Sequence, residues 1–204
     1  MSGLIQRIKD IQRHYGAAVD GVFGPMTAEA VWRGMHGDIP ADDAGGTPTL
    51  PLDERTLKNI ATLDPKVRES FRQFACLAKA SAATLGCDYV MVCGTRTFAE
   101  QAELYALGRT APGEKVTNAR AGFSNHNFGI AGDFGVFRGK AYLDSTDPAT
   151  AAKVHRLCSE HALACGLEWG GSWASLKDLP HYEIATGLSM AEKREKFSKG
   201  GSIV

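Results

Sequence analysis

The chain lacks both net charge and long hydrophobic runs. Among its 204 residues, 23 Lys and Arg balance 23 Asp and Glu, so no overall field attracts nucleic acid or an anionic membrane. The opening residues MSGLIQRIKDIQRH interrupt their apolar side chains with charges too often for a signal-peptide core or a membrane span. We therefore expect a protein without a signal peptide or integral membrane segment, made in the cytoplasm, that binds no nucleic acid.

The chain also lacks the paired cysteine motifs of disulfide scaffolds and structural zinc sites. Its five cysteines are an odd set with apolar neighbours and include no CxxC pair. This pattern predicts buried free thiols in a reducing compartment. We therefore assign no disulfide bridge and no metal ligand to Cys76, Cys87, Cys93, Cys158 or Cys165.

A stretch of linker composition divides the chain into two unequal parts. The run GDIPADDAGGTPTLPL, from Gly37 to Leu52, is rich in Gly, Pro, Asp and Thr and has no hydrophobic periodicity. We place the linker at residues 39–52. It separates a small module, residues 1–38, from a larger domain, residues 53–204.

The small module has a helical pattern. Apolar residues recur at helical spacing from Leu4 to Ile11, the Asp-Gly pair at Asp20 favours a turn, and a second helix can begin near Pro25. The run IQRHYGAAVDGVFGPMTAEAVW resembles the three-helix peptidoglycan-binding module of many cell-wall hydrolases. The resemblance implies that residues 1–38 bind bacterial peptidoglycan. A generic helical hairpin is the alternative.

The first half of the larger domain alternates helical and strand signals. Asp64 and Pro65 can cap and begin a helix whose apolar stripe ends near Gly86. The run CDYVMVCG has the composition of a buried strand. Thr97 and Glu100 form a capping box for the helix FAEQAELYALG.

The second half continues in the same irregular order. IAGDFGVF and AYLD, joined by a short RGK turn, predict a β-hairpin, and Asp147 begins a helix that ends near Gly166. HYEIA is a short strand, and Ser189 with Glu192 caps a last helix. Helices and short strands in this order predict an α+β domain with a small antiparallel sheet flanked by helices.

The run SNHNFGIAGDF, from Ser124 to Phe134, places His126 and Asp133 seven residues apart. On one uninterrupted strand the two side chains would point to opposite faces, but Gly129 and Gly132 give the backbone freedom to bend so that they converge. The pair alone does not distinguish a metal site from a polar turn. A catalytic zinc site needs three protein ligands and one open position, so a third donor must come from elsewhere.

The best third donor is a histidine near the end of the chain. His181 lies in the run DLPHYEI, where a proline precedes a strand that can hold an imidazole in place. Asp178, in the preceding loop, could approach a metal-bound water, and Glu183 shares a strand face with His181 and is the rival base. Of the remaining candidates, His14 and His36 are disfavoured because they lie in the small module. His155 and His161 are disfavoured because they lie six residues apart on one predicted helix and do not share a face cleanly.

Four motifs then occur in order between Val90 and Ile184: GTRTFAEQAELY, SNHNFGIAGDF, EWGGSW and DLPHYE. Together they resemble the zinc D,D-peptidases and L-alanyl-D-glutamate peptidases of peptidase family M15, a group with VanY-like and VanX-like enzymes and several bacteriophage endolysins. The endolysin branch is the most similar. Several separated motifs in agreement are far more specific than any one of them.

The resemblance implies that each chain binds one Zn²⁺ through His126, Asp133 and His181. Asp178 matches the acidic residue that serves as general base, and Arg96 matches the arginine that steadies the polarised carbonyl. It also places Ser124 and Trp173 in the lining of the substrate cleft. Ser172 departs from the pattern, because many relatives have aspartate there, so the contacts of that acid are in doubt.

Each role has a structural alternative that the residues themselves leave open. Asp178 could only cap the turn before Pro180, and Arg96 could pair with Glu100 one helical turn on. Trp169 and Trp173 could be ordinary core aromatics.

The function implied by the resemblance is that of an endolysin, a monomer that cleaves the L-alanyl-D-glutamate bond of the peptidoglycan stem peptide. It would wait in the host cytoplasm and reach the wall after another protein opens the membrane. One alternative is a D,D-carboxypeptidase or dipeptidase that removes terminal D-alanine. The other is a wall-binding protein whose zinc domain is catalytically inactive.

Overall fold

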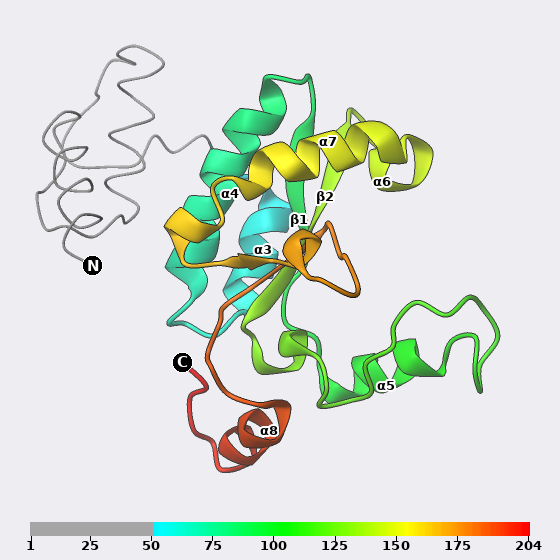
Figure 1. The fold of residues 1–204 in the computed structure, drawn as a ribbon, viewed down its shortest axis with the longest axis vertical. Helices are drawn as coiled ribbons and strands as arrows, with labels where there is room; N and C mark the ends of the chain where they lie inside the picture. Colours follow the sequence, from blue (N-terminus) through cyan, green and yellow to red (C-terminus); the bar gives the residue numbers. More distant parts are fainter. Residues whose placement is uncertain (1–50) are drawn as a thin grey trace, which may run out of the picture. The chain divides into compact units, whose positions relative to one another are not determined.

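The computed structural model describes residues 51–204 (Figure 1). The predicted module of residues 1–38 and the linker as far as residue 50 lie outside the described residues. The larger domain is α+β with a small antiparallel sheet flanked by helices, which confirms the predicted fold class.

The sheet is built around one long strand. β2 (Ala131–Arg138) lies between β1 (Asp88–Cys93) and β5 (His181–Glu183), and β4 (Glu168–Trp169) pairs with the far side of β5. All of these pairings are antiparallel. β2 and β5 therefore hold side by side two segments that lie far apart in the sequence.

The predicted hairpin after β2 is confirmed in part. Arg138 pairs with Ala141 across a tight turn in which Gly139 has a φ of 59°, and β3 (Ala141–Tyr142) continues the pairing. The rest of the predicted strand is wrong, because α6 (Leu143–Thr146) begins at once. The Asp144 carboxylate accepts a hydrogen bond from the backbone N of Val136 at 2.8 Å, which folds this segment back onto β2.

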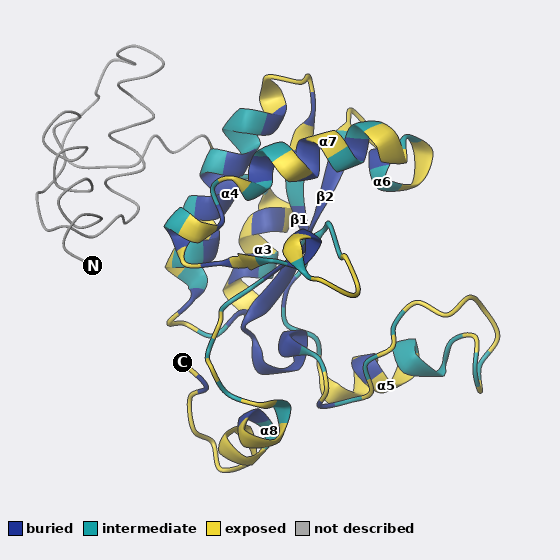
Figure 2. Ribbon diagram, in the orientation of Figure 1, coloured by how far each residue is buried: buried dark blue, intermediate teal, exposed yellow. Residues whose placement is uncertain are grey.

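Three helices cover the sheet and form the core with it. α4 (Arg68–Ala83) packs against β1 and against α7 (Pro148–Ser159), and α3 (Glu54–Thr62) also packs against β1. Phe74 of α4 contacts Phe134 of β2 edge to face, with ring centroids 5.1 Å apart, and lies 4.3 Å from the ring of Tyr182. Figure 2 shows β2 and the inward face of α4 buried, as this packing requires.

The outer edge of β1 is closed by side chains of α3. Thr56 Oγ1 accepts a hydrogen bond from the backbone N of Met91 at 3.0 Å, and Asn59 donates to the Met91 carbonyl at 2.8 Å. An uncovered edge strand presents backbone groups that can pair with another chain. These two side chains satisfy the backbone N–H and carbonyl of Met91, in the middle of that edge.

The predicted helix boundaries are confirmed where a cap specifies them. Capping boxes begin both α5 (Phe98–Ala106), at Thr97, and α8 (Met190–Ser198), at Ser189. The start predicted for α4 is wrong by one turn: the Asp64 carboxylate accepts a hydrogen bond from Lys66 N at 2.9 Å in a turn, and the helix begins only at Arg68.

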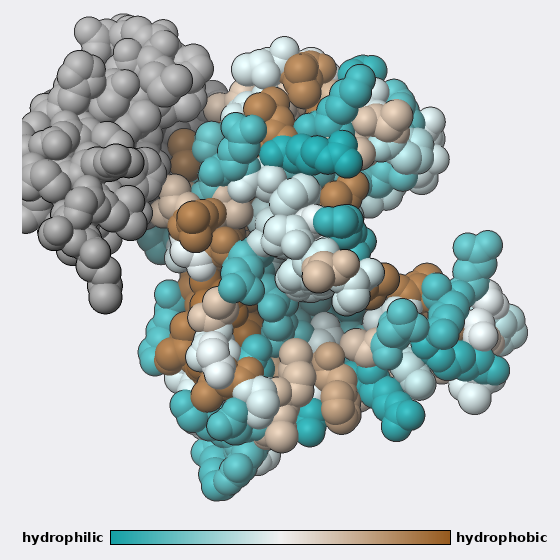
Figure 3. Space-filling view, viewed as in Figure 1, coloured by the Kyte–Doolittle hydropathy of each residue, from teal (hydrophilic) through white to brown (hydrophobic). Residues whose placement is uncertain are grey.

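No disulfide joins the cysteines, all of which lie in the described part of the chain. Cys76, Cys87, Cys158 and Cys165 are buried, as predicted, whereas Cys93 is only half-buried at the end of β1. In residues 51–204 no helix is long and apolar enough to cross a bilayer. The face in Figure 3 mixes hydrophilic side chains with separate apolar patches.

Candidate active site

Strand register brings two of the predicted metal ligands together. Asp133 of β2 lies directly opposite His181 of β5, and on its other side it pairs with Cys93 of β1. Directly opposed residues of antiparallel strands project from the same face of the sheet. The sheet itself therefore places the Asp133 carboxylate beside the His181 imidazole.

His126 reaches the same point from outside the sheet. It lies in η1, a 3₁₀ helix (Asn125–Phe128) that ends at Gly129, whose φ is 69°. A Cβ at Gly129 would approach the backbone N of Asp64 to 2.9 Å. Both this close approach and the positive φ require glycine at the turn.

The prediction that both glycines bend one strand is therefore wrong. Gly129 turns the chain between a helix and a strand. Gly132 lies inside β2, where a Cβ would collide with the Met91 side chain, so its role is to make room for the core.

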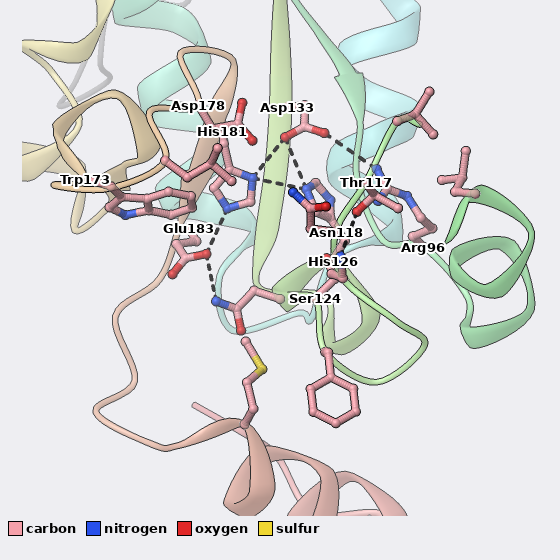
Figure 4. A pocket seen from close by; sticks show the side chains of 17 residues that line it. Arg96, Thr117, Asn118, Ser124, His126, Asp133, Trp173, Asp178, His181 and Glu183 are labelled. Atoms are coloured by element: carbon pink, nitrogen blue, oxygen red, sulfur yellow. Dashed lines mark hydrogen bonds and ion pairs between the residues drawn. The ribbon is translucent and has the colours of Figure 1, made fainter. Parts of the chain in front are cut away.

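The three side chains converge within hydrogen-bond distance of one another (Figure 4). Asp133 Oδ1 lies 3.1 Å from His126 Nε2 and 3.0 Å from His181 Nδ1, and the two nitrogens are 3.3 Å apart. Ligand atoms at the usual 2.0–2.2 Å from a tetrahedral zinc ion lie about 3.3–3.6 Å from each other, a few tenths of an ångström more than the separations here. The spacing of these atoms fits such an ion.

The partners of the remaining ring nitrogens show where the imidazole lone pairs point. His126 Nδ1 lies 2.8 Å from the Gly94 carbonyl, and His181 Nε2 lies 2.8 Å from Glu183 Oε2. A carbonyl and a carboxylate only accept, so those nitrogens carry the hydrogens in the neutral rings. His126 Nε2 and His181 Nδ1 then both direct lone pairs at the Asp133 oxygen, an arrangement that requires a cation or protons between them.

Protons stabilise the same cluster. Burial lowers the pKa of His126, but the negative charge and hydrogen bond of Asp133, with those of Cys93, outweigh it and raise that pKa to about 10. Burial likewise opposes ionisation of Asp133, yet both histidines together lower the pKa of its carboxyl below its usual range. A metal bound here must displace the proton that His126 holds.

Arg96 lies at the edge of the cluster. Its guanidinium donates to Gln101 Oε1 at 2.9 Å and to Cys93 Sγ at 3.3 Å, and lies 3.7 Å from Asp133 Oδ2. Glu100 accepts from Thr97 in the capping box. The structure therefore brings Arg96 to the site and leaves Glu100 in the helix cap, which excludes their surface pairing.

Asp178, in the loop before β5, lines a cavity that adjoins the cluster. Among residues 51–204, neither a backbone N–H nor a side chain donates a hydrogen bond to its carboxylate, so it does not cap the turn before Pro180. Its burial, and next the negative charge of Asp133, raise the pKa of Asp178. A carboxylate whose pKa lies closer to neutrality is suited to taking and returning a proton.

A glycine holds this loop against the site. The backbone N of Asp178 donates to the Gly170 carbonyl at 3.1 Å. A Cβ at Gly170 would come within 2.6 Å of the Asp178 carbonyl oxygen and 3.1 Å of His181 Cβ. Only glycine lets the two segments approach this closely.

Glu183, the rival base, is already used as an acceptor. Its Oε2 accepts from His181 at 2.8 Å and from Asn125 Nδ2 at 2.7 Å. Burial raises the pKa of Glu183, but these hydrogen bonds outweigh that effect and lower it. The geometry favours Asp178 for proton transfer and gives Glu183 the task of orienting His181.

A cavity of about 520 Å³ opens over the cluster, and both Ser124 and Trp173 line it. The Trp173 ring lies 5.1 Å from that of His181, whereas Trp169 donates to the Leu179 carbonyl at 2.7 Å and packs against the core. Ser172 is exposed and donates to the Trp169 carbonyl at 2.7 Å. The substitution at Ser172 thus lies outside the cavity lining.

Cys93 is the residue of the site that sequence reasoning missed. Donor atoms of Cys93, His126 and Asp133 lie within 4.8 Å of one another, so these three could also hold a metal. However, Cys93 Sγ approaches His126 Nδ1, at 3.8 Å, and that nitrogen is engaged with Gly94. His126, Asp133 and His181 are therefore the better ligand set. No local sequence signal pairs Cys93 with Asp133, because their contact comes from strand register.

An α+β domain whose central strands and an adjoining turn present a carboxylate and two imidazoles to an open cavity has the architecture of a metal-dependent hydrolase. Residues 117–184 match the family model described as D-alanyl-D-alanine carboxypeptidase. The chain is 44% identical over 117 residues to the peptidoglycan L-alanyl-D-glutamate endopeptidase CwlK of Bacillus subtilis (strain 168), which covers 55% of this chain and 70% of CwlK. On that match, the chain belongs to peptidase family M15.

Two solved structures are also similar. The L-Ala D-Glu endopeptidase ChiX of Serratia marcescens has 23% identity and a TM-score of 0.45, over 66% of this chain and 89% of ChiX. The vancomycin-resistance D,D-pentapeptidase VanY of a VanB-type cassette, in complex with Zn(II), has 15% identity and a TM-score of 0.40, over 69% of this chain and 81% of VanY.

Proposed function

We propose that the protein is a zinc peptidase of the bacterial cell wall that cleaves the L-alanyl-D-glutamate bond of the peptidoglycan stem peptide. One Zn²⁺ would be held by His126, Asp133 and His181. The observation that carries this proposal is the convergence of three ligand atoms within 3.0–3.3 Å at the floor of the cavity. The choice of bond follows the 44% identity to CwlK.

Each residue around the cluster would have its own role in the reaction. A bound Zn²⁺ would polarise the scissile carbonyl and lower the pKa of water to about 7. Asp178 would take the proton of the attacking water and return it to the leaving amine. The Arg96 guanidinium would stabilise the negative charge on the carbonyl oxygen, and Ser124 and Trp173 would contact the peptide.

The biological setting proposed is that of a phage endolysin, acting as a monomer. It is supported by the resemblance of residues 90–184 to the endolysin branch of the family and of residues 1–38 to a peptidoglycan-binding module. A wall-binding module joined by a linker raises the effective concentration of a catalytic domain at an insoluble substrate. The enzyme would reach the wall once another protein had opened the host membrane.

A second candidate is a carboxypeptidase that releases terminal D-alanine. The match of residues 117–184 to a family model of that description favours it. Both candidates use the same zinc chemistry, so they differ in the bond that the cavity selects.

Digestion of purified sacculi with the full chain, followed by mass spectrometry of the new termini, tests the proposal. New N-terminal D-glutamate is the expected product, and Asp178→Asn is the matched inactive control. Release of free D-alanine without new D-glutamate termini would support the second candidate. Equal digestion by wild type and Asp178→Asn would remove Asp178 from the mechanism.

A further inference from the structure

A chain of hydrogen bonds runs from the last helix of the domain to the candidate metal ligand His181. Lys193 of α8 donates from Nζ to Asn125 Oδ1 at 2.8 Å, and Asn125 Nδ2 donates to Glu183 Oε2 at 2.7 Å. The same Glu183 oxygen accepts from His181 Nε2 at 2.8 Å. Figure 4 shows Glu183 between His181 and the amide that it bonds.

The chemistry of the two charged members sets the direction of every bond in this chain. An ammonium group only donates, so it holds the Asn125 oxygen and turns the amide NH₂ toward Glu183. An ionised carboxylate only accepts, so His181 must present Nε2–H to it. His181 Nδ1 is then left with its lone pair facing Asp133, which is the state a metal requires.

Burial makes Lys193 unusual on a surface helix. It is 6% exposed, the one lysine of residues 51–204 that is buried, and Asn125 is 7% exposed. Lysine is almost never fully buried unless it is paired. Here the ammonium group donates to the Asn125 oxygen, and the same amide donates to the Glu183 carboxylate, so the buried lysine is held one amide away from the acceptor of His181.

Other contacts dock α8 independently of Lys193. The Arg194 guanidinium lies 4.1 Å from the ring centroid of Phe123, and the ring of Phe197 lies 5.5 Å from that of Phe128 and 5.8 Å from that of Phe98. A helix held in this way does not need Lys193 for its attachment. The buried lysine is thus available for a purpose other than docking.

We propose that α8 helps to build the metal centre, with Lys193 and Asn125 as positioning residues. Through Glu183 they hold His181 in the tautomer and orientation that bind the metal. The inference rests on the proposed zinc site. It assigns a direct effect on metal affinity to a helix that lies outside the metal-binding motifs.

The zinc dissociation constant of the full chain, measured by competition with a chromophoric chelator, tests this inference. Partners that orient metal ligands are typically worth about 10–100-fold in metal affinity, and Lys193→Met is expected at the lower end, about tenfold weaker than wild type. Lys196→Met, an exposed lysine on the same helix, is the matched control and should bind zinc as wild type does. Unfolding temperatures recorded with excess chelator show whether each variant is folded.

The same substitution made in a Glu183→Leu variant separates a positioning role of Lys193 from a general loss of packing. Glu183→Leu removes the acceptor and breaks the chain next to His181, so adding Lys193→Met to it should weaken zinc binding no further. If Lys193→Met does not fold, Lys193→Gln, which keeps a donor without the charge, is measured in the same two backgrounds.

Unchanged zinc affinity in Lys193→Met, or an equal loss in both backgrounds, would overturn the inference. His181→Ala distinguishes that failure from failure of the zinc site itself. If His181→Ala loses zinc while Lys193→Met does not weaken it, only the role of α8 is wrong. If His181→Ala keeps stoichiometric zinc, the proposed function fails with it.

Discussion

Two aspartate–histidine clusters lie beside this small sheet, and they differ in how their hydrogen-bonding atoms are satisfied. In the core, Asp144 Oδ1 lies 2.6 Å from His155 Nε2, His155 Nδ1 lies 2.7 Å from the Tyr89 hydroxyl, and that hydroxyl lies 3.0 Å from the Tyr182 hydroxyl. Donors and acceptors alternate along this chain: the Asp144 carboxylate accepts from His155 Nε2, and His155 Nδ1 accepts from the Tyr89 hydroxyl, which can accept from Tyr182. The core cluster is complete as it stands.

The cluster at the cavity is the opposite case. In their neutral forms His126 and His181 each donate their one N–H to a partner outside the cluster, so His126 Nε2, His181 Nδ1 and Asp133 Oδ1 face one another as three acceptors. The comparison teaches that an Asp–His contact alone does not mark a metal site. A metal site is marked by an excess of lone pairs beside a cavity, and substitutions in each cluster can test that difference.

The largest difference is expected from removing one histidine of each cluster. His181→Ala should abolish stoichiometric zinc binding and wall digestion, because two ligands remain of three. His155→Ala should keep its zinc, since the ring nitrogens of His155 bond Asp144 and Tyr89 and none of the three proposed ligands. Metal analysis of the two purified variants checks this, and zinc retained in His181→Ala would contradict the ligand assignment.

The next largest effect is expected on kcat, from replacing Asp178 in the loop before β5. Asp178→Asn should lower kcat by about 10²–10⁴-fold, the usual worth of a general acid–base group, while zinc content stays at one per chain. The reason is that, within residues 51–204, the carboxylate of Asp178 has no hydrogen bond to lose, so the change should affect proton transfer and not the metal ligands. Kinetics on a soluble stem peptide with metal analysis in parallel would refute this role if activity and zinc fell together.

The pH dependence of zinc affinity comes third. The pKa of His126, raised to about 10, lies above neutrality, so at neutral pH zinc must displace a proton. Below that pKa the protonated form dominates, and each unit of rising pH should tighten binding by about tenfold for each proton released. Chelator competition between pH 6 and pH 8 measures the slope. A flat profile would show that no proton is exchanged.

The smallest effect is expected in the core cluster. Tyr89→Phe removes the hydroxyl that donates to His155 and leaves a buried acceptor unsatisfied, at a cost of about 1–3 kcal/mol in the free energy of unfolding. Zinc affinity should not change. Chemical denaturation with chelator present gives the first quantity, and a matching loss of zinc affinity would show that the two clusters are coupled.

Local signals in the sequence predict much of the fold. Capping boxes locate α5 and α8, and the tight turn at Gly139 locates the hairpin. Where the signal is not local, prediction fails. Asp64 and Pro65 form a turn before α4, and the segment after Tyr142 becomes a helix because Asp144 is drawn to the backbone of β2.

For the site residues, too, prediction succeeds where the signal is local and fails where it is not. Spacing and composition suggest His126, Asp133 and His181 and make Asp178 a candidate base with Glu183 as its rival, while the choice of Asp178 and the role of Arg96 come from the family resemblance. Cys93 and Lys193 could not be predicted, because one depends on strand register and the other on the burial of a lysine in a helix whose composition is that of a surface.

Anomalous diffraction at the zinc edge, on crystals of the zinc-loaded full chain, tests the central claim most directly. We predict one peak per chain, bonded at about 2.0–2.2 Å by His126 Nε2, Asp133 and His181 Nδ1. A peak bonded to Cys93 Sγ in place of His181, or density at His181 Nε2 with Glu183 displaced, would contradict the account.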